Sequence, residues 1–429
     1  MSELRPQKGA WGIVALLFLF MVINFADKAV IGLAAVPIMQ ELKLTPKEFG
    51  LIGSGFYLLF ALSAVMTGFV VNRVQTRWVL LAMGLIWALT QFPMLGPVGF
   101  GTILACRVAL GAGEGPAYPV ALHATYKWFP NELRTLPTAM IAQGGAVGVL
   151  VSLPLLNRVI VHWGWHWAFG VLGFAGLAWA AAWLALGREG PIADTGAPSA
   201  GPAAAGPRIP YSRLLSNPTI VASWCASFGA YWGLSQALTW QGAFMIKGLG
   251  FTQGGIGLLS ALPSGVSVIV LLAGGWLSQR LLAGGIGSRW ARGVFGGAGV
   301  MLGGIALLLL PYMPNAGLEI AMTIIGTALP TVIYIIWPSI VGEITPAAQR
   351  GALLTIGTAI GTLPGLLAPY VMGSVVENAA TPLAGFHFGY SICGAVMLLG
   401  GIIGALLMDP EREIERLGGV APMVQYRRA

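Results

Sequence analysis

Four charged side chains stand inside long apolar stretches of this sequence: Asp27, Lys28, Arg107 and Glu114. A charge at the centre of a membrane helix costs about 2.5–3.5 kcal/mol on the insertion scale, so these residues must be paired or face an aqueous cavity. Two cations in one cavity suit an anionic ligand. Two carboxylates in a low dielectric have their ionised forms disfavoured, which makes them proton carriers. The four residues therefore predict that the binding of an anion is coupled to the binding of a proton.

The spacing of these residues restricts how they can pair. Arg107 and Glu114 are seven residues apart, which puts them on one helix face about 10.5 Å apart along the axis. The neighbours Asp27 and Lys28 point about 100° apart and need partners on another helix. The simplest hypothesis pairs Asp27 with Arg107 and Lys28 with Glu114. The alternative interpretation is two buried ion pairs that only fix helix register.

The composition indicates the kind of fold that must position these residues. Of the 429 residues, 56% are hydrophobic and only 9% are charged, against about 25% charged in soluble domains. We therefore predict an all-α membrane protein with twelve transmembrane helices. The predicted spans are 11–36, 49–71, 78–97, 99–126, 135–157, 163–187, 216–246, 252–279, 293–312, 318–341, 351–376 and 384–408.

The loops predict the orientation of the chain and its division into two halves. If the N-terminus is cytoplasmic, most of the 23 Lys and Arg residues fall on the cytoplasmic side, as the positive-inside rule requires. Both termini are then cytoplasmic. The Gly/Ala/Pro-rich break after Gly187 reads as a flexible linker. The predicted parts are a six-helix bundle at 1–187, a linker at 188–215, a second six-helix bundle at 216–408 and a cytoplasmic tail at 409–429.

Two short sequence similarities between the halves suggest that they arose by duplication. Residues 68–73 (GFVVNR) resemble 275–280 (GWLSQR), and residues 130–134 (PNELR) resemble 346–350 (PAAQR). Both pairs lie in corresponding predicted loops. Duplicated helical halves around a site near the membrane midplane are typical of secondary transporters.

With these features, the sequence resembles the major facilitator superfamily and, within it, the anion:cation symporter family. The motifs that carry the resemblance are 24–28 (NFADK), 107–119 (RVALGAGEGPAYP), 128–130 (WFP) with Arg134, 164–169 (GWHWAF) and 369–373 (PYVMG). The resemblance implies two pseudo-symmetric bundles that alternate access by rocking, and proton-coupled uptake of a small organic anion of the carboxylate class. It implies Glu114 as a protonation site, joined by Asp27 for proton coupling, and the Lys28/Arg107 region as the anion site.

The sequence departs from the family at several positions. The family usually has Arg where this chain has Lys28, which lacks the bidentate fork of a guanidinium. The superfamily's acidic gate positions are amides here, so we expect a cytoplasmic gate of Asn72, Arg73, Arg134, Gln279, Arg280 and Arg350 with a weaker ion-pair contribution. Phe60, Thr358 and Thr362 replace polar residues of sugar-acid relatives. Because buried hydroxyls need matched partners, these losses favour a small or partly apolar anion.

Other side chains in the spans are weaker candidates. Tyr57, Gln236, Tyr334 and Trp337, with Thr358 and Thr362, are predicted to contact the substrate. The alternative for the aromatic residues is packing or a place at the membrane interface.

The remaining classes of function are less favoured. A proton-coupled exporter of drugs or metabolites would also use embedded carboxylates, and a membrane-embedded sensor or enzyme is a more distant alternative. Cys106, Cys225 and Cys393 are far apart and no Cys/His cluster occurs. We therefore expect no enzyme activity, no cofactor or metal, and no nucleic-acid partner. The expected partners are protons, the anion and the lipid bilayer of the inner (plasma) membrane, and we expect a monomer.

Overall fold

The apolar runs fold as helices, because in lipid a chain must satisfy its backbone hydrogen bonds internally. The computed structural model describes residues 7–70, 73–130, 133–192 and 209–416, and this part of the chain contains helices and no strands. Three of the α-helices are short: α2 (Ala35–Glu41), α10 (Tyr211–Leu215) and α19 (Pro410–Arg416). The longer helices are α1 (Ala10–Leu33), α3 (Pro46–Leu58), α4 (Phe60–Val70), α5 (Thr76–Gln91), α6 (Phe100–Glu114), α7 (Ala117–Tyr126), α8 (Thr135–Trp163), α9 (Trp165–Leu186), α11 (Pro218–Ala243), α12 (Ile256–Ala283), α13 (Phe295–Leu309), α14 (Ala316–Ala328), α15 (Ile333–Ile344), α16 (Ala347–Thr362), α17 (Pro364–Glu377) and α18 (Pro382–Leu407).

Ten helical stretches in the described residues are long and apolar enough to cross a membrane by length and composition. The predicted spans 99–126 and 216–246 are not among them, yet both are helical. The first is divided at Gly115 and Pro116 into α6 and α7, since proline lacks the N–H that a continuing helix needs. The second is α11, whose Ser, Thr and Gln residues lower its hydropathy. The all-α membrane fold class is confirmed.

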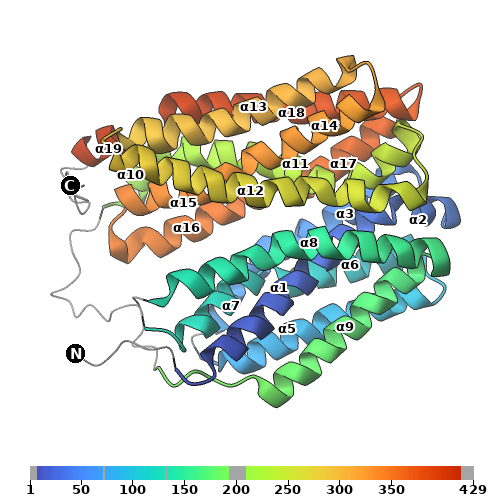
Figure 1. Cartoon of the computed structure of the whole chain (residues 1–429), viewed down its shortest axis with the longest axis horizontal. Helices are drawn as coiled ribbons and strands as arrows, with labels where there is room; N and C mark the ends of the chain where they lie inside the picture. The colour runs from blue at the N-terminus through green and yellow to red at the C-terminus, as the bar shows by residue number, and fades with distance from the viewer. Residues whose placement is uncertain (1–6, 71–72, 131–132, 193–208, 417–429) are drawn as a thin grey trace. The chain divides into compact units, whose positions relative to one another are not determined.

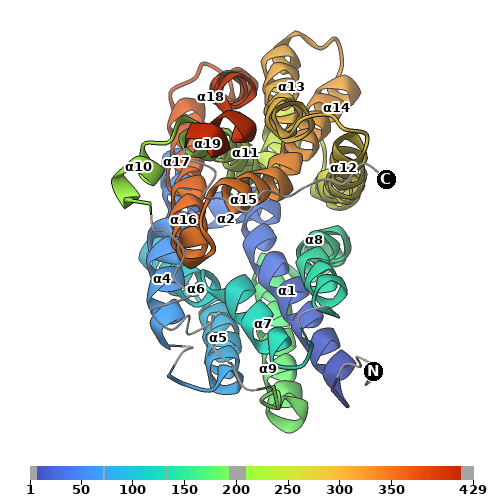
Figure 2. The ribbon, with the colours of Figure 1, turned by 90° about the vertical axis from the view of Figure 1, so that its left-hand side faces the viewer.

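The chain divides into two units, and each is described by itself. Unit 1 comprises Met1–Ser199, Leu238–Gly265 and Pro369–Glu377; unit 2 comprises Ala200–Ala237, Val266–Ala368 and Asn378–Ala429. In unit 1, α1 packs on α8, α5 on α9 and α3 on α6. In unit 2, α13 packs along α18, and both views show these two helices side by side (Figures 1 and 2). The predicted division at 188–215 stays a prediction, and residues 193–208 and 417–429 lie outside the described part.

Small residues allow these helices to approach closely. A Cβ built on Gly297 of α13 would lie 2.3 Å from the backbone nitrogen of Ala405 on α18. Only a glycine fits at that separation. Packing of this kind replaces the hydrophobic effect inside a membrane, where lipid tails are as apolar as leucine.

Unit 1 contains a close seam between α1 and the final residues of α11. A Cβ on Gly32 would lie 2.1 Å from the backbone oxygen of Leu238, and one on Gly242 would lie 2.5 Å from the oxygen of Gly32. Hydrogen bonds support the same region, because the Gln253 side chain donates to the Leu33 oxygen at 3.1 Å and to Asn157 Oδ1 at 2.9 Å. Backbone groups and amides therefore form this seam.

Replacing Gly32 by Ala is expected to destabilise unit 1, because the backbone of Leu238 cannot move aside as a flexible side chain can. Overpacking of this kind costs about 1–3 kcal/mol. The matched control is Gly12→Ala on the same helix, where a Cβ meets nothing within 4 Å, so better helix propensity raises stability slightly. Thermal unfolding followed by tryptophan fluorescence measures both. A Gly32→Ala variant as stable as Gly12→Ala would disprove the close contact.

The two units end their bundles in similar ways at the predicted cytoplasmic side. In unit 1, Glu189 follows α9 and accepts hydrogen bonds from Thr76 Oγ1 and from the backbone N–H of Arg77, at the start of α5. In unit 2, Glu411 lies in α19, beyond the end of α18, and accepts from the backbone N–H of Ser288, just before the helical stretch Arg289–Tyr312 that contains α13. In both units, therefore, a glutamate beyond the sixth span caps the start of the third, as duplicated halves predict.

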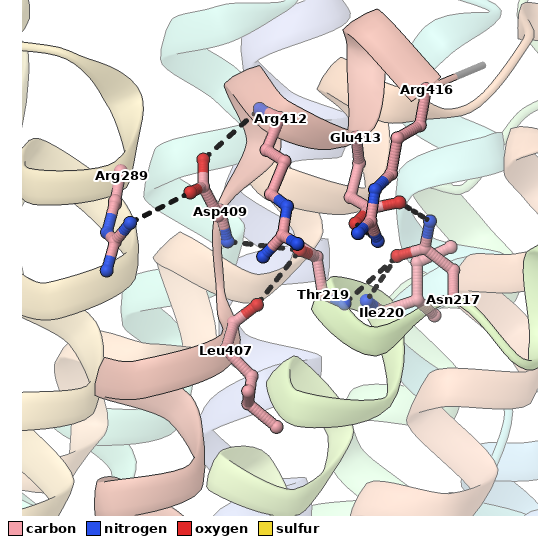
Figure 3. A network of polar contacts seen from close by, with 9 residues as sticks. All are labelled: Asn217, Thr219, Ile220, Arg289, Leu407, Asp409, Arg412, Glu413 and Arg416. Carbon is pink, nitrogen blue, oxygen red and sulfur yellow. Dashed lines mark hydrogen bonds and ion pairs between the residues drawn. The ribbon is translucent and has the colours of Figure 1, made fainter.

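Unit 2 adds a larger polar network at this end (Figure 3). Thr219 Oγ1 donates to the Leu407 oxygen at 3.0 Å and accepts from the Asp409 N–H at 3.0 Å. The Asn217 amide donates to Glu413 at 2.9 Å, and Arg289 pairs with Asp409 at 3.1 Å. These contacts hold the first turn of α11 against the end of α18 and α19, so part of the predicted tail is ordered.

The unit 1 capping site predicts a pH-dependent stability. Partial burial opposes ionisation of Glu189, but hydrogen bonds from Lys127, Thr76 and the Arg77 backbone outweigh it and hold its pKa below the usual value. A carboxyl whose pKa falls on folding stabilises the protein above its unfolded pKa, about 4.3, and this stabilisation is lost as pH falls through the folded pKa. Glu189→Gln should therefore lower the melting temperature at pH 7, and the difference should shrink toward pH 4. A difference that is constant with pH would contradict this assignment.

Candidate functional site

Helices α1 and α6 of unit 1 bring the four predicted charges together. Asn24 and Lys28 are four residues apart on α1, so they share one face. Arg107 and Glu114 are seven apart on α6 and share another. All four charged side chains are buried: Asp27 and Glu114 are 1% exposed, Arg107 5% and Lys28 8%. The cluster is therefore inside the bundle and not on its lipid-facing surface.

Lys28 is the centre of this cluster. Its Nζ lies 3.3 Å from Glu114 Oε2, which confirms the predicted pairing of these two residues. Nζ also donates to Asn24 Oδ1 at 2.6 Å. Aromatic rings surround the ammonium, with ring centroids at 4.5 Å (Phe25), 5.2 Å (Phe60) and 5.9 Å (Phe56). Such rings attract a cation through their quadrupole while excluding water.

Arg107 reaches α1 in a different way from the one predicted. Its Nη1 donates to the backbone oxygen of Asp27 at 3.0 Å, and its guanidinium lies 4.8 Å from the Phe56 ring centroid. The hypothesis that Arg107 binds the Asp27 carboxylate is therefore wrong in this structure. The physical reason is that the carbonyl and the side chain of a helical residue leave the axis in different directions. Arg107 meets the carbonyl.

Several buried polar atoms of this cluster have no hydrogen-bond partner among the described residues. The acceptors are Asp27 Oδ1 and Glu114 Oε1, the oxygen that does not pair with Lys28, and the donors are Asn24 Nδ2 and Arg107 Nε. Buried polar atoms are normally satisfied, so each exception needs an explanation. Open acceptors on carboxylates suit protons, and open donors beside two cations suit an anion.

The other predicted substrate contacts are divided between the units. Tyr57 lies in unit 1, where its ring packs edge-on against Phe56 at 4.9 Å and it interacts with Arg107. The remaining five lie in unit 2: Gln236, Tyr334, Trp337, Thr358 and Thr362. Their role at the site stays a prediction.

Within unit 2, Trp337 and Gly357 are close neighbours. A Cβ on Gly357 would lie 2.8 Å from the Trp337 ring and 2.3 Å from Nε1 of Trp224. The threonines are occupied locally, because Thr358 Oγ1 donates to the Leu354 oxygen at 2.8 Å and Thr362 Oγ1 to the Thr358 oxygen at 3.0 Å. Both hydroxyl groups therefore donate within α16.

Two of the predicted gate residues form hydrogen bonds with their own loops. Arg134 donates to the Phe129 oxygen at 3.1 Å, and Arg350 to the Thr345 oxygen at 3.4 Å. Arg73, Gln279 and Arg280 are exposed, and the Arg280 guanidinium lies 5.1 Å from the Trp276 ring centroid. Asn72 lies outside the described residues. The gate therefore remains a prediction.

Sequence reasoning missed Asn24 and the phenylalanines as neighbours of Lys28. The signal for Asn24 was present, because an amide four residues before a lysine lies on the same helix face. No sequence pattern indicated that Phe56 and Phe60 lie near Lys28, because their position depends on how α3 and α4 pack against α6. In the described part of the chain, no group of three or more His, Cys, Asp or Glu residues is placed to hold a metal ion.

Comparison with known proteins identifies transporters that are similar in sequence to this chain. The chain is 27% identical over 312 residues to a probable chloroplastic anion transporter 4 of rice (Oryza sativa subsp. japonica), covering 70% of this chain and 53% of that protein. It is 27% identical over 270 residues to a hexuronate transporter of Bacillus subtilis, covering 62% and 64%. It is 26% identical over 421 residues to a probable sulfoacetate transporter of Cupriavidus necator, covering 93% of each. The chain thus spans about half of the rice relative and slightly less than two thirds of the Bacillus relative.

Solved structures support the same fold at low identity. A bacterial homologue of the human lysosomal transporter Spinster superposes with a TM-score of 0.77 at 18% identity, covering 95% of this chain and 98% of that one. A D-xylose-proton symporter superposes with a TM-score of 0.75 at 16% identity, covering 94% and 99%. The family model of the Major Facilitator Superfamily matches residues 17–369. The chain belongs to the Major Facilitator Superfamily, with relatives that fit the resemblance to its anion:cation symporters.

Proposed function

We propose that this membrane transporter imports a small organic anion of the carboxylate class together with protons, by alternating access, across the inner membrane with both termini in the cytoplasm. The observation that carries the proposal is the buried Lys28–Glu114 pair at 3.3 Å, with Arg107 and Asp27 beside it. A pair that only fixed register would leave no buried acceptors open, whereas Glu114 Oε1 and Asp27 Oδ1 lack hydrogen-bond partners among the described residues.

Charge balance supplies the coupling. In their usual ionised forms the two carboxylates and two cations sum to zero, so an anion that binds alone leaves net charge in a low dielectric, which is costly. One proton that binds with a monoanion, or two that bind with a dianion such as phthalate or sulfoacetate, remove this cost. When the anion binds to Lys28, Glu114 loses its cationic partner and accepts the proton more readily. By linkage, binding of the anion and binding of the proton favour each other.

The surroundings support an anion with an apolar part. Phe25, Phe56 and Phe60 surround the Lys28 ammonium. Relatives are named for hexuronate, sulfoacetate and galactarate/glucarate transport, so the carboxylate group is the part that their named organic substrates share. A sugar acid would need hydroxyl partners that these side chains do not offer.

Uptake into proteoliposomes with an imposed pH gradient tests this function. The probes are radiolabelled phthalate, sulfoacetate and glucuronate, each measured with an inward proton gradient, with no gradient and with an outward gradient. We expect inward-gradient accumulation of at least one acid, with phthalate or sulfoacetate preferred to glucuronate. Accumulation only under the outward gradient would support the alternative, a proton-coupled exporter. The absence of any gradient effect on all three would reject proton coupling of organic anions.

A further inference from the structure

Asn24 is the closest polar partner of Lys28. It is fully buried, and its Oδ1 accepts from Lys28 Nζ at 2.6 Å. An ammonium has donors only, so the atom facing it must be the amide oxygen and not the nitrogen. The orientation of the amide is thereby determined. Its Nδ2 is left buried without a hydrogen-bond partner among the described residues.

The two contacts of Lys28 differ in kind. Glu114 supplies a charge, with its Oε2 at the longer distance of 3.3 Å, while its Oε1 has no hydrogen-bond partner among the residues that the structure describes. Asn24 supplies a hydrogen bond at 2.6 Å without a charge. Hydrogen bonds to charged groups are stronger than neutral ones, so Asn24 can hold the ammonium in place while its charge is shared elsewhere.

We infer that Asn24 is a positioning residue of the coupling site: it holds Lys28 when Glu114 takes up the proton, and its free N–H group donates to an oxygen of the anion that Lys28 then binds. This inference rests on the proposed symport. In the step, the proton moves onto a Glu114 oxygen, the ion pair with Lys28 is lost, and no covalent bond forms or breaks in the substrate. Asn24 keeps the lysine from losing all its protein partners at that moment.

The charged groups that act on Glu114 are few. Lys28 and Asp27 lie on α1 and Arg107 on α6, and all three interact with the Glu114 carboxylate; Tyr57 on α3 interacts with Arg107. The other titratable side chains on the helices packed against α1 are Glu41, Arg77, Tyr118, His123, Tyr126, Arg158, His162 and His166.

Two variants of nearly equal size separate positioning from packing. Asn24→Leu keeps the bulk but removes both the acceptor and the donor. Lys28 then depends on Glu114 alone, so protonation of Glu114 becomes harder. The pH of half-maximal uptake should move about one unit toward acid, a tenfold change in proton concentration, with an increase in KM because the donor is lost.

Asn24→Asp keeps the shape and the acceptor but adds a charge that competes with the anion for Lys28. At neutral pH the KM should rise tenfold or more. As pH falls, the new carboxyl group becomes protonated. It is then neutral and still has an acceptor oxygen, as the amide does, so the KM should return toward the wild-type value. A variant that only disturbed packing would show no such recovery.

Uptake is measured in proteoliposomes from pH 5 to 8 with whichever of phthalate, sulfoacetate and glucuronate the wild type accumulates fastest, and folding is checked by size exclusion. Wild-type pH profile and KM in Asn24→Leu would overturn the inference. If that variant does not fold, a pH-independent KM in Asn24→Asp would overturn it. In both cases the proposed symport still stands if the wild-type protein accumulates the anion along the proton gradient. If uptake by the wild-type protein does not respond to the pH gradient, the symport itself is rejected.

Discussion

Glu114→Gln is expected to bind the anion but to lose all accumulation driven by a pH gradient. Glutamine has the shape of a protonated glutamate and cannot release a proton, so it holds the site in its anion-ready state next to Lys28, 3.3 Å away in the wild type. With one proton per monoanion, a gradient of one pH unit drives about tenfold accumulation. The variant should reach a ratio of about one. Exchange of labelled for unlabelled anion across the membrane should continue, because exchange needs no net proton movement.

The control for this variant is Glu41→Gln. Glu41 is an exposed carboxylate at the end of α2 that lies 2.8 Å from His166 and accepts from Trp165, both of them outside the charged cluster. Its loss should leave the accumulation ratio unchanged. Tenfold accumulation by Glu114→Gln would remove Glu114 from proton coupling and move that role to Asp27.

The sequence predicted the cluster because charges inside a membrane must find partners. The sixteen residues from Trp11 to Ala26 are too few to cross the bilayer, so Asp27 and Lys28 had to be embedded, and they are buried in α1. The Lys28–Glu114 contact followed from charge alone. The partner of Arg107 did not, because charge cannot tell whether a guanidinium meets a carboxylate or a carbonyl of the same residue.

The fold was predictable at the level of spans and less so at the level of helices. Hydropathy locates apolar runs but is blind to local breaks such as those between α3 and α4 at Leu59 and between α6 and α7 at Gly115. It also cannot show that Leu238–Gly265 and Pro369–Glu377 belong to unit 1. That association depends on close backbone contacts such as Gly32 with Leu238, which are a matter of shape.

Lys28→Met should abolish transport, and its double variant with Glu114→Gln decides why. Methionine has nearly the length of lysine without the charge. Removing one partner of a buried pair strands the other, here Glu114 at 1% exposure, and costs about 3–5 kcal/mol of stability. Loss of the cation should also weaken anion binding by about 2–5 kcal/mol, roughly 30-fold or more in Kd.

Lys28→Met/Glu114→Gln removes both charges and should regain most of the stability lost by Lys28→Met, because neither charge is then stranded. If the pair serves transport, the double variant melts near the wild-type temperature and still fails to bind the anion, measured by tryptophan fluorescence and uptake. If the pair only fixed helix register, restored stability would bring restored uptake. The double variant therefore separates a functional lysine from a structural one. Stability returns without transport only if the Lys28 charge binds the substrate.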